Sequence, residues 1–569
     1  MTTLTRRTLL AATTAGLAAP LLSRAGLAAS LAEAKAFVDD YRSNLTTNLT
    51  VDTNAAVRIL SGVRSYWQTG TAWNNGTVLN AAVLRANIRF CEKRTAGRTD
   101  AEAAWSFIVD RRHQSYAVID GLGPWAAAYR TTALAVTGIT EAPAGTPATT
   151  ISDAVPAGAP AGSTLGAGSP TSPLGQIVTL VNTVRGNWSS SNPSKFAVQY
   201  PRPWRLTTDS TVVDTGVLDA FGFPVYQSKV VVAPQLLRQR GLVPGDDGGF
   251  PSGHTNALHL AALAFAYAFP ERFQELLTCA FDLADTRITA GMHSPLDVVS
   301  GRILATALAA AILGDPANAE LKVAARAQAA AFLADNPGVG TDTFADRSAN
   351  RRLILPKLTY ILPRTGPDKP LTVPKGAEVL LETRQPYLTA DQRRAVLRST
   401  ALPAGYALLD GPEQWGRLDL FKAADGYGAF ETDVDVTLDG VSDAWRNDIT
   451  GRGGLTLRGT GTLTLTGTNR FRGGVRVLGG TLAATGAHSL GDGDVEISGA
   501  TLRTIVPGMC LDGTVTIGPG STLAVSTAAR GPVLTAERVT GRFAKVTVDG
   551  RPAEAVYTRT SISARILKP

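Results

Sequence analysis

The sequence predicts a multidomain protein in which an all-α helical domain is followed by a short β-solenoid. The chain has 569 residues, enough for three or four domains at roughly 150 residues each. Most of residues 30–335 show Ala-rich apolar patterns with helical spacing. Residues 444–569 instead repeat short alternating segments about every 20 residues, which is typical of stacked coils.

The composition excludes two other classes of protein. Apolar residues make up 44% of the chain, too many for a disordered protein. The formal net charge is +8 and the basic residues are scattered, whereas nucleic-acid-binding surfaces gather them on one face. We therefore expect no nucleic-acid partner.

Residues 1–29 are predicted to be an export signal. Arg6 and Arg7 precede a short apolar run, and small residues follow as far as Ala29. Paired arginines favour the twin-arginine route, so we expect a secreted protein, extracellular or periplasmic. The run is shorter than the ~20 residues of a membrane span, and we expect no membrane span in the mature chain.

The helical domain is predicted to cover residues 30–335, with a mixed connecting region at 336–443. Residues 141–175 are dense in Ala, Pro, Gly, Ser and Thr, so we expect a low-complexity loop, either a linker or a surface insertion. In the connecting region, Thr389 and Gln392 have the spacing of a helix capping box. Helices are expected at 80–92, 174–185, 257–313, 320–334 and 389–400.

A repeat of about 20 residues organises the C-terminal region. Alternating apolar and polar residues within this period indicate one coil of short strands per repeat, about four coils in all. Gly/Thr-rich antiparallel strands are the alternative. The recurring segments are Gly-Thr-Leu at 461–463 and 480–482, Ala-Thr-Leu at 500–502, Ser-Thr-Leu at 521–523, and the strands at 475–477, 495–497 and 515–517.

Three motifs of the helical region bring cations and histidines together. Their cationic side chains can bind a multiply charged oxyanion, Arg as a bidentate fork and Lys as a point charge. Ser252 and Gly253 stand where an apolar helix begins, so free backbone N–H groups would face the same anion. The sequence therefore predicts a pocket for phosphate or a similar oxyanion. The motifs are Lys195 to Arg202-Pro203, Pro251-Ser252-Gly253-His254, and Thr286-Arg287 with His293 and Asp297.

The two histidines of these motifs supply the reactivity. A histidine with a pKa near 6.5 can act as nucleophile, acid or base. Asp297 lies four positions after His293, where it can hold the ring and fix its tautomer. We expect His293 to be the nucleophile and His254 the acid that protonates the leaving oxygen and later activates water.

The motifs Lys-x6-Arg-Pro, Pro-Ser-Gly-His and Arg-x5-His-x3-Asp, in this order, resemble the type-2 phosphatidic acid phosphatase superfamily. This group includes class A bacterial acid phosphatases and vanadium haloperoxidases. Residues 269–287 look close to the class A enzymes, although Thr286 stands where the family has Ser.

The resemblance implies an α-helical bundle and metal-free phosphoryl transfer through phosphohistidine, without a cofactor. By position, it implies that His293 is the nucleophile, Asp297 its partner and His254 the general acid. It also implies a phosphate cradle of Lys195, Arg202, Ser252, Gly253 and Arg287. Separately, residues 453–482 resemble the autotransporter-associated β-strand repeat, which implies a right-handed parallel β-solenoid.

We therefore expect a secreted, metal-independent acid phosphatase that hydrolyses small phosphomonoesters. One alternative is a vanadate-dependent haloperoxidase that uses the same pocket, with vanadate as its cofactor. The other is a surface or adhesion protein whose solenoid is the working part. The sequence names no partner for the solenoid.

Other conspicuous residues are expected to be structural. His259 is expected to pack or to lie at the surface, and His113 and His488 to lie at the surface. Asp246 and Asp247 are expected to be solvated carboxylates of a Gly-rich loop.

Overall fold

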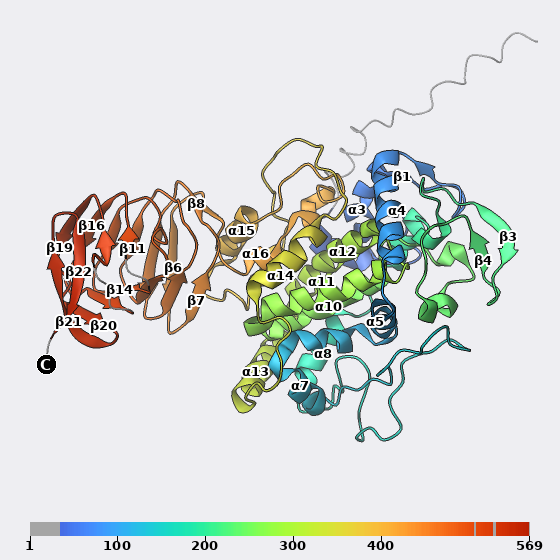
Figure 1. Cartoon of the computed structure of the whole chain (residues 1–569), viewed down its shortest axis with the longest axis horizontal. Coiled ribbons are helices and arrows are strands. Elements are labelled where there is room, and N and C mark those ends of the chain that lie inside the picture. The colour runs from blue at the N-terminus through green and yellow to red at the C-terminus, as the bar shows by residue number, and fades with distance from the viewer. Residues whose placement is uncertain (1–34, 506–507, 527–530, 568–569) are drawn as a thin grey trace, which may run out of the picture.

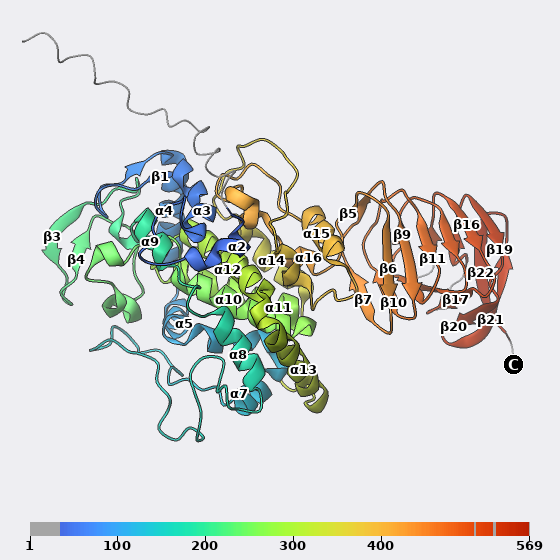
Figure 2. The same ribbon diagram turned by 180° about the vertical axis from the view of Figure 1, so that it is seen from behind.

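The computed structural model describes residues 35–505, 508–526 and 531–567. A helical part, which includes the segment from 336 to about 425, is followed by a β-solenoid that projects from it (Figure 1). The view from behind shows the same arrangement (Figure 2). The predicted helical domain and solenoid are thus confirmed. The predicted export signal lies outside the described residues.

The secondary-structure elements keep the order of the chain. The α-helices are α2 (Phe37–Asp40), α3 (Ala55–Ile59), α4 (Ala81–Ala96), α5 (Asp100–Arg111), α6 (Gln114–Val118), α7 (Ala126–Ala133), α8 (Gly175–Val184), α9 (Asn192–Val198), α10 (Gly253–Ala268), α11 (Phe273–Thr289), α12 (Pro295–Gly314), α13 (Ala319–Asp335), α14 (Arg347–Ile354), α15 (Ala390–Ser399) and α16 (Leu420–Ala423). The 3-10 helices are Tyr41–Ser43, Ser61–Ser65, Ile119–Trp125, Pro203–Arg205, Pro234–Gln239, Pro244–Asp246, Pro270–Arg272, Pro316–Asn318, Leu355–Leu358, Ala377–Leu381 and Pro412–Arg417. The strands are β1 (Trp67–Gln68), β2 (Thr77–Val78), β3 (Asp214–Leu218), β4 (Pro224–Tyr226), β5 (Ala429–Phe430), β6 (Val434–Leu438), β7 (Ser442–Trp445), β8 (Thr450–Gly451), β9 (Leu455–Gly459), β10 (Thr462–Leu465), β11 (Val475–Val477), β12 (Thr481–Ala484), β13 (Val495–Ile497), β14 (Thr501–Thr504), β15 (Met509–Cys510), β16 (Thr514–Ile517), β17 (Thr522–Val525), β18 (Leu534–Thr535), β19 (Arg538–Gly541), β20 (Lys545–Val548), β21 (Arg551–Tyr557) and β22 (Ser561–Ile566).

Helices α10, α11 and α12 form the centre of the helical part and pack against one another. Every residue of α12 from Pro295 to Leu313 is buried, because a helix that is apolar on all sides needs neighbours on all sides. Among the described helices, α12 alone is long and apolar enough to cross a membrane. Its complete burial is typical of a core helix.

Local capping sets the starts of the predicted helices. Asn80 caps α4, where its side chain accepts a hydrogen bond from the Val83 N–H at 3.1 Å. Thr389 and Gln392 form the predicted capping box of α15, with bonds of 2.9 and 3.2 Å. In the connecting region, α14 packs against α11, so this segment covers the helical core instead of crossing open space.

The low-complexity segment is a surface insertion of the helical part. No helix or strand interrupts residues 141–173. The Arg111 guanidinium donates to the Ile151 carbonyl at 2.8 Å, and the Thr146 hydroxyl donates to the Pro234 carbonyl at 2.9 Å. Of the two alternatives left by the sequence, the structure selects the insertion.

The repeat positions stack in register. Thr462 pairs with Thr481, and Leu463 with Leu482, in parallel strands β10 and β12; β14 and β17 continue the ladder. The leucines of this ladder are fully buried. Gly480, at φ +63°, turns the chain where a Cβ would lie 2.5 Å from the Gly461 carbonyl oxygen. The parallel ladders exclude the antiparallel alternative.

The solenoid is longer than the repeats suggest. Among the described residues, six strands form one parallel sheet in the order β6-β9-β11-β13-β16-β19. The prediction of about four coils is therefore wrong. The outer strand β6 lacks the Gly-Thr-Leu pattern but still alternates buried Val434, Val436 and Leu438 with exposed residues, and this alternation is all that stacking requires. At the far end, β21 and β22 pair antiparallel and extend the second sheet.

Two residues of β7 join the first coil to the helical part. The Asp443 carboxylate accepts two hydrogen bonds from the Arg384 guanidinium at 2.8 and 2.9 Å. Trp445 is fully buried, with ring centroids 5.2 Å from Tyr427 and 6.1 Å from Phe430. The join therefore depends on one residue at the predicted boundary, Asp443, and on one just beyond it, Trp445.

A chain that ends at residue 443 should keep the hydrolytic activity expected from the sequence but be less stable than a chain that ends at 451. Only the longer chain keeps Trp445, and the loss of a buried Trp side chain costs about 3–5 kcal/mol. Thermal unfolding and hydrolysis assays of the two chains test this. A shorter chain that folds by circular dichroism yet is inactive would show that the solenoid shapes the site.

Candidate active site

The predicted site residues meet at one end of the central helices. His254 lies in the first turn of α10, Arg287 near the end of α11, His293 in the loop that follows, and Asp297 in the first turn of α12. Lys195 lies in α9 and contacts the loop before α10, where its Nζ donates a hydrogen bond to the Gly248 carbonyl. The structure thus brings together groups that are up to about 100 residues apart, and their catalytic roles stay a prediction.

His293 is held between an arginine and a carboxylate. Its Nε2 lies 3.0 Å from the Arg202 Nη1, and its Nδ1 lies 3.4 Å from the Asp297 Oδ2. A guanidinium can only donate, so the Nε2 must carry a lone pair and the proton must sit on Nδ1, toward Asp297. This tautomer presents a nucleophilic nitrogen to the cations.

Asp297 is itself fixed by the start of α12. Its Oδ2 accepts a hydrogen bond from the Ser294 N–H at 2.7 Å, and its backbone carbonyl accepts one from the Ser252 N–H at 2.9 Å. Burial raises the pKa of Asp297 above its usual value. The Asp297 carboxylate therefore lies beside the His293 Nδ1 without a hydrogen bond to it, and the Asp297 backbone ties α12 to the start of α10.

The two small residues of the Pro-Ser-Gly-His motif differ in what they can offer an anion. Ser252 is the N-cap of α10, and its hydroxyl accepts hydrogen bonds from the N–H and the hydroxyl of Thr255. Its backbone N–H already donates to Asp297, so its hydroxyl proton is what remains for phosphate. Gly253 follows with the first N–H of the helix, which faces outward along the helix dipole.

Asp247 was expected to be a solvated carboxylate, but it pairs with two arginines. Its Oδ1 accepts hydrogen bonds from the Arg202 Nε and Nη2 at 2.8 and 2.6 Å, and its Oδ2 accepts one from the Arg205 Nη2 at 2.9 Å. Burial raises the pKa of Asp247, but the two guanidinium groups outweigh it and lower the pKa overall. Only Asp246 is the exposed carboxylate that was expected. Asp247 instead fixes the orientation of Arg202.

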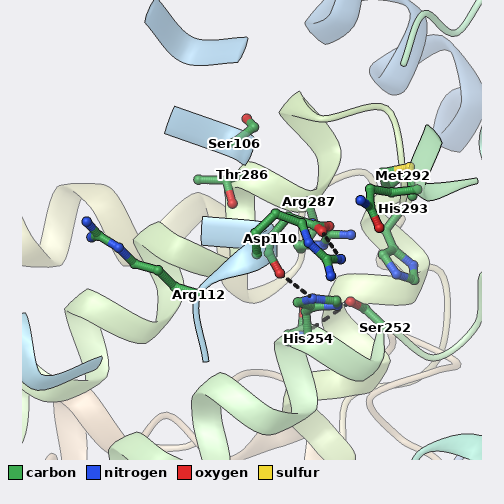
Figure 3. Close-up of polar contacts among 12 residues, drawn as sticks. Ser106, Asp110, Arg112, Ser252, His254, Thr286, Arg287, Met292 and His293 are labelled. Atoms are coloured by element: carbon green, nitrogen blue, oxygen red, sulfur yellow. Dashed lines mark hydrogen bonds and ion pairs between the residues drawn. The ribbon is translucent and has the colours of Figure 1, made fainter. Parts of the chain in front are cut away.

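Asp110, at the end of α5, is a site residue that the sequence did not reveal. Its carboxylate forms a buried ion pair with Arg287, and its backbone carbonyl accepts a hydrogen bond from the His254 Nε2 at 3.0 Å. Figure 3 shows Asp110, Arg287 and His254 gathered together, with His293 across from them. No spacing rule connects residues so far apart in the chain. For Asp247, the signal was its place four residues before the start of the Pro-Ser-Gly-His motif.

Lys195 and Thr286 complete the surroundings. The Lys195 Nζ donates to the Gly248 carbonyl at 2.7 Å, and burial together with Arg202 lowers the pKa of this lysine. Thr286 replaces the Ser of the family pattern, and its hydroxyl donates to the Leu283 carbonyl at 2.6 Å within α11. The neighbouring Arg287 forms its ion pair with Asp110.

The remaining histidines lie in three different environments. His259 is buried, with its Nδ1 3.0 Å from the Thr255 carbonyl and its ring edge against Phe281. His488 is exposed, as expected. His113 is not a free surface residue, because it is half-buried and lies 3.2 Å from the Arg185 guanidinium. Among the described residues, no group of three or more His, Cys, Asp or Glu side chains is arranged to hold a metal ion.

The rings of His293 and His254 should stay uncharged at pH 5 in the phosphate-free protein. Burial, and then nearby cations, lower the pKa of His293 well below 6.5, and burial with Arg287 lowers that of His254 to about 3. Ring-nitrogen NMR of the folded protein tests this, with the urea-unfolded protein as the control. A charge gained near pH 6.5 in the folded state would contradict it.

The lowered pKa values of His293 and His254 also determine how the free energy of unfolding depends on pH. Below pH ~6.5 the unfolded chain binds protons that the folded chain does not. The free energy of unfolding should therefore fall as the pH decreases from about 6.5 toward the lowered values. Urea unfolding at pH 7 and pH 5 measures this change.

Comparison with known proteins agrees with this geometry. The PAP2 superfamily profile matches residues 174–319, and the passenger-associated-transport-repeat profile matches residues 455–484. A non-specific acid phosphatase of Salmonella typhi is 43% identical over 56 residues, which are 10% of this chain and 22% of that protein.

The names of two further relatives describe an autotransporter lipoprotein and an extracellular protease. The Neisserial autotransporter lipoprotein NalP of Neisseria meningitidis serogroup B is 35% identical over 132 residues, 22% of this chain and 12% of that protein. An extracellular serine protease of Serratia marcescens is 34% identical over 149 residues, 20% of this chain and 14% of that protein. The chain spans less than a quarter of the length of each of these relatives. Residues 174–319 are therefore a PAP2 superfamily domain, and residues 455–484 of the solenoid are a passenger-associated-transport repeat.

Proposed function

We propose that this chain is an exported, metal-independent acid phosphatase that hydrolyses phosphomonoesters through a phosphohistidine intermediate. The observation that carries the proposal is the environment of His293. Its Nε2 bears a lone pair and faces the Arg202 guanidinium at 3.0 Å, while Asp297 lies behind the ring. A nucleophile that points at a cluster of cations suits an anionic electrophile such as a phosphoryl group.

In the first step, the substrate phosphate replaces His293 as the acceptor of the Arg202 hydrogen bond. The negative charge on its remaining oxygens is neutralised by Lys195 and Arg287. The Gly253 N–H donates a hydrogen bond to one of these oxygens. The His293 Nε2 then forms a bond to phosphorus as the bond from phosphorus to the ester oxygen breaks. Asp297 stabilises the positive charge that develops on the ring.

His254 acts as the general acid in the first step and as the general base in the second step. Its Nε2 donates to the Asp110 carbonyl, which leaves Nδ1 for the substrate. A bound phosphate dianion raises the low pKa of this ring, because an opposite charge nearby favours the protonated form. His254 can then give a proton to the departing ester oxygen and later take one from the water that displaces phosphate from His293.

Hydrolysis of phenyl phosphate in the presence of a chelator tests the function. We expect release of phenol and phosphate that a chelator leaves unchanged, because the charge of the phosphate is met by arginine and lysine side chains. Bromide oxidation with added vanadate is measured in parallel. Activity that a chelator abolishes and a divalent metal restores would overturn the proposal, as would bromide oxidation without hydrolysis.

Export is the second part of the proposal. It rests on Arg6 and Arg7 before a short apolar run, and on relatives whose names describe an autotransporter and an extracellular protein. Replacing both arginines by lysine should retain the protein inside the cell with residues 1–29 attached. Normal export of that variant would exclude the twin-arginine route and leave the general secretory route.

A further inference from the structure

A polar cavity of about 360 Å³ opens beside His254. One wall is the first turns of α10, with Gly253, His254, Ala257 and Leu260. Residues 189–191, three consecutive serines, form a second wall, and Gln114 and Arg185 are also among the lining residues. The proposed general acid His254 therefore borders this cavity, whereas His293 is not among its lining residues.

Among the residues that line this cavity, Arg185 is the one lysine or arginine, and His254 is the one histidine. Its Nη1 donates to the Ser115 hydroxyl at 2.7 Å, and its Nη2 donates to the Gln114 Oε1 at 3.1 Å. The ring nitrogens of His113 lie 3.2 and 3.3 Å from Nη1. Burial, and then the positive charge of Arg185, lower the pKa of His113 to about 4. All three partners are therefore neutral at pH 7.

This lack of a counter-ion sets Arg185 apart from the other arginines of the site. Arg202 and Arg205 pair with Asp247, and Arg287 pairs with Asp110. Within the described part of the chain, no carboxylate oxygen lies within 4.0 Å of the Arg185 guanidinium. Arg185 is half-buried, and its hydrogen-bond partners are neutral, so its charge has no counter-ion. A partly buried charge of this kind is costly, and the guanidinium is prepared to bind an anion that enters from solution.

We propose that this cavity holds the leaving group of the phosphomonoester and that Arg185 binds an anionic group, a carboxylate or a second phosphate, on that leaving group. The inference rests on the proposed function, because His254 locates the ester oxygen at the mouth of the cavity. The serines offer hydroxyls to polar parts of the leaving group, and Ala257 and Leu260 contact its carbon skeleton. The substrates favoured by this site are phosphorylated hydroxy acids and bisphosphates.

Matched pairs of substrates test the proposal. The first pair is phenyl phosphate and 4-carboxyphenyl phosphate, and the second is the monophosphate and the bisphosphate of propane-1,3-diol. In the full chain, kcat/KM should be about 10- to 100-fold higher for the more anionic member of at least one pair, the range of a charge-assisted hydrogen bond. The pair that shows the preference distinguishes carboxylate from phosphate.

Substitution of Arg185 assigns the preference to this side chain. In Arg185→Gln the ratio of kcat/KM within the pair should fall to near one, and Arg185→Lys should restore part of it. The control is Arg476→Gln, which removes the same charge from an exposed ion pair with Glu496 in the solenoid and should leave the ratio unchanged. A ratio near one in the unsubstituted chain overturns the inference, as does a ratio that Arg185→Gln retains.

A binding measurement separates this inference from the proposed function. Calorimetry gives the affinities of phenylphosphonate and 4-carboxyphenylphosphonate, which cannot be hydrolysed. If the chain hydrolyses phenyl phosphate but shows no preference in either pair, the leaving-group inference fails and the function stands. If neither ester of any pair is hydrolysed, the function fails. The affinity ratio in the unsubstituted chain and in Arg185→Gln then decides whether the cavity binds an anion.

Discussion

Replacing His293 with alanine should abolish turnover and leave no covalent phosphoenzyme. In the proposed mechanism the ring supplies the Nε2 that attacks phosphorus, and the alanine side chain in its place has no nucleophilic atom. The loss should be roughly 10⁶-fold in kcat, the scale seen when a hydrolase loses its nucleophile. Rapid-quench trapping with phosphate-labelled substrate measures both the rate and the intermediate. The matched control is His488→Ala, which removes an exposed histidine of the solenoid.

His254→Ala should behave differently, because the nucleophile and the cations remain. General acid catalysis contributes about 10²- to 10⁴-fold, and an alkyl phosphate should lose most of it. A nitrophenyl ester needs little protonation, so its phosphorylation step should survive and acid-labile phosphohistidine should accumulate. Label found on the His293→Ala protein would contradict the assignment of the nucleophile.

Asp110→Asn should weaken both the fold and the site. The Asp110 carboxylate is the partner of Arg287 in a buried ion pair, and loss of one partner leaves an uncompensated charge that costs about 3–5 kcal/mol in the free energy of unfolding. An arginine freed from this partner no longer faces the phosphate in a fixed orientation, so kcat/KM should fall by about 10²-fold or more. Urea unfolding and steady-state kinetics measure the two effects.

Asp110→Asn changes the side chain that pairs with Arg287 but keeps the backbone carbonyl of residue 110. His254 donates to the Asp110 backbone carbonyl, and this contact survives the substitution. The control is Asp120→Asn, which breaks a pair between Arg130 and a partly exposed Asp120 and should cost about 1 kcal/mol or less. Unchanged stability together with unchanged affinity for vanadate would show that Asp110 does not position Arg287.

The sequence by itself determined the parts of the protein that depend on local pattern. Capping residues such as Asn80 and Thr389 fixed helix starts, because a cap acts on N–H groups two or three residues away. The spacing of Gly-Thr-Leu predicted the solenoid and its register, because each coil repeats the contacts of its neighbour. The three motifs predicted an oxyanion site, since the residues of each motif are close in the chain.

Only the tertiary structure decided which distant groups complete the site and how long the solenoid is. Asp110 reaches Arg287 from another helix, Asp247 pairs with Arg202 across a loop, and Arg185 is left without a carboxylate. The outer coil β6 lacks the repeat pattern yet stacks in parallel with β9. Packing brings these groups together after long loops have closed, and no local propensity or spacing encodes which charges then become neighbours.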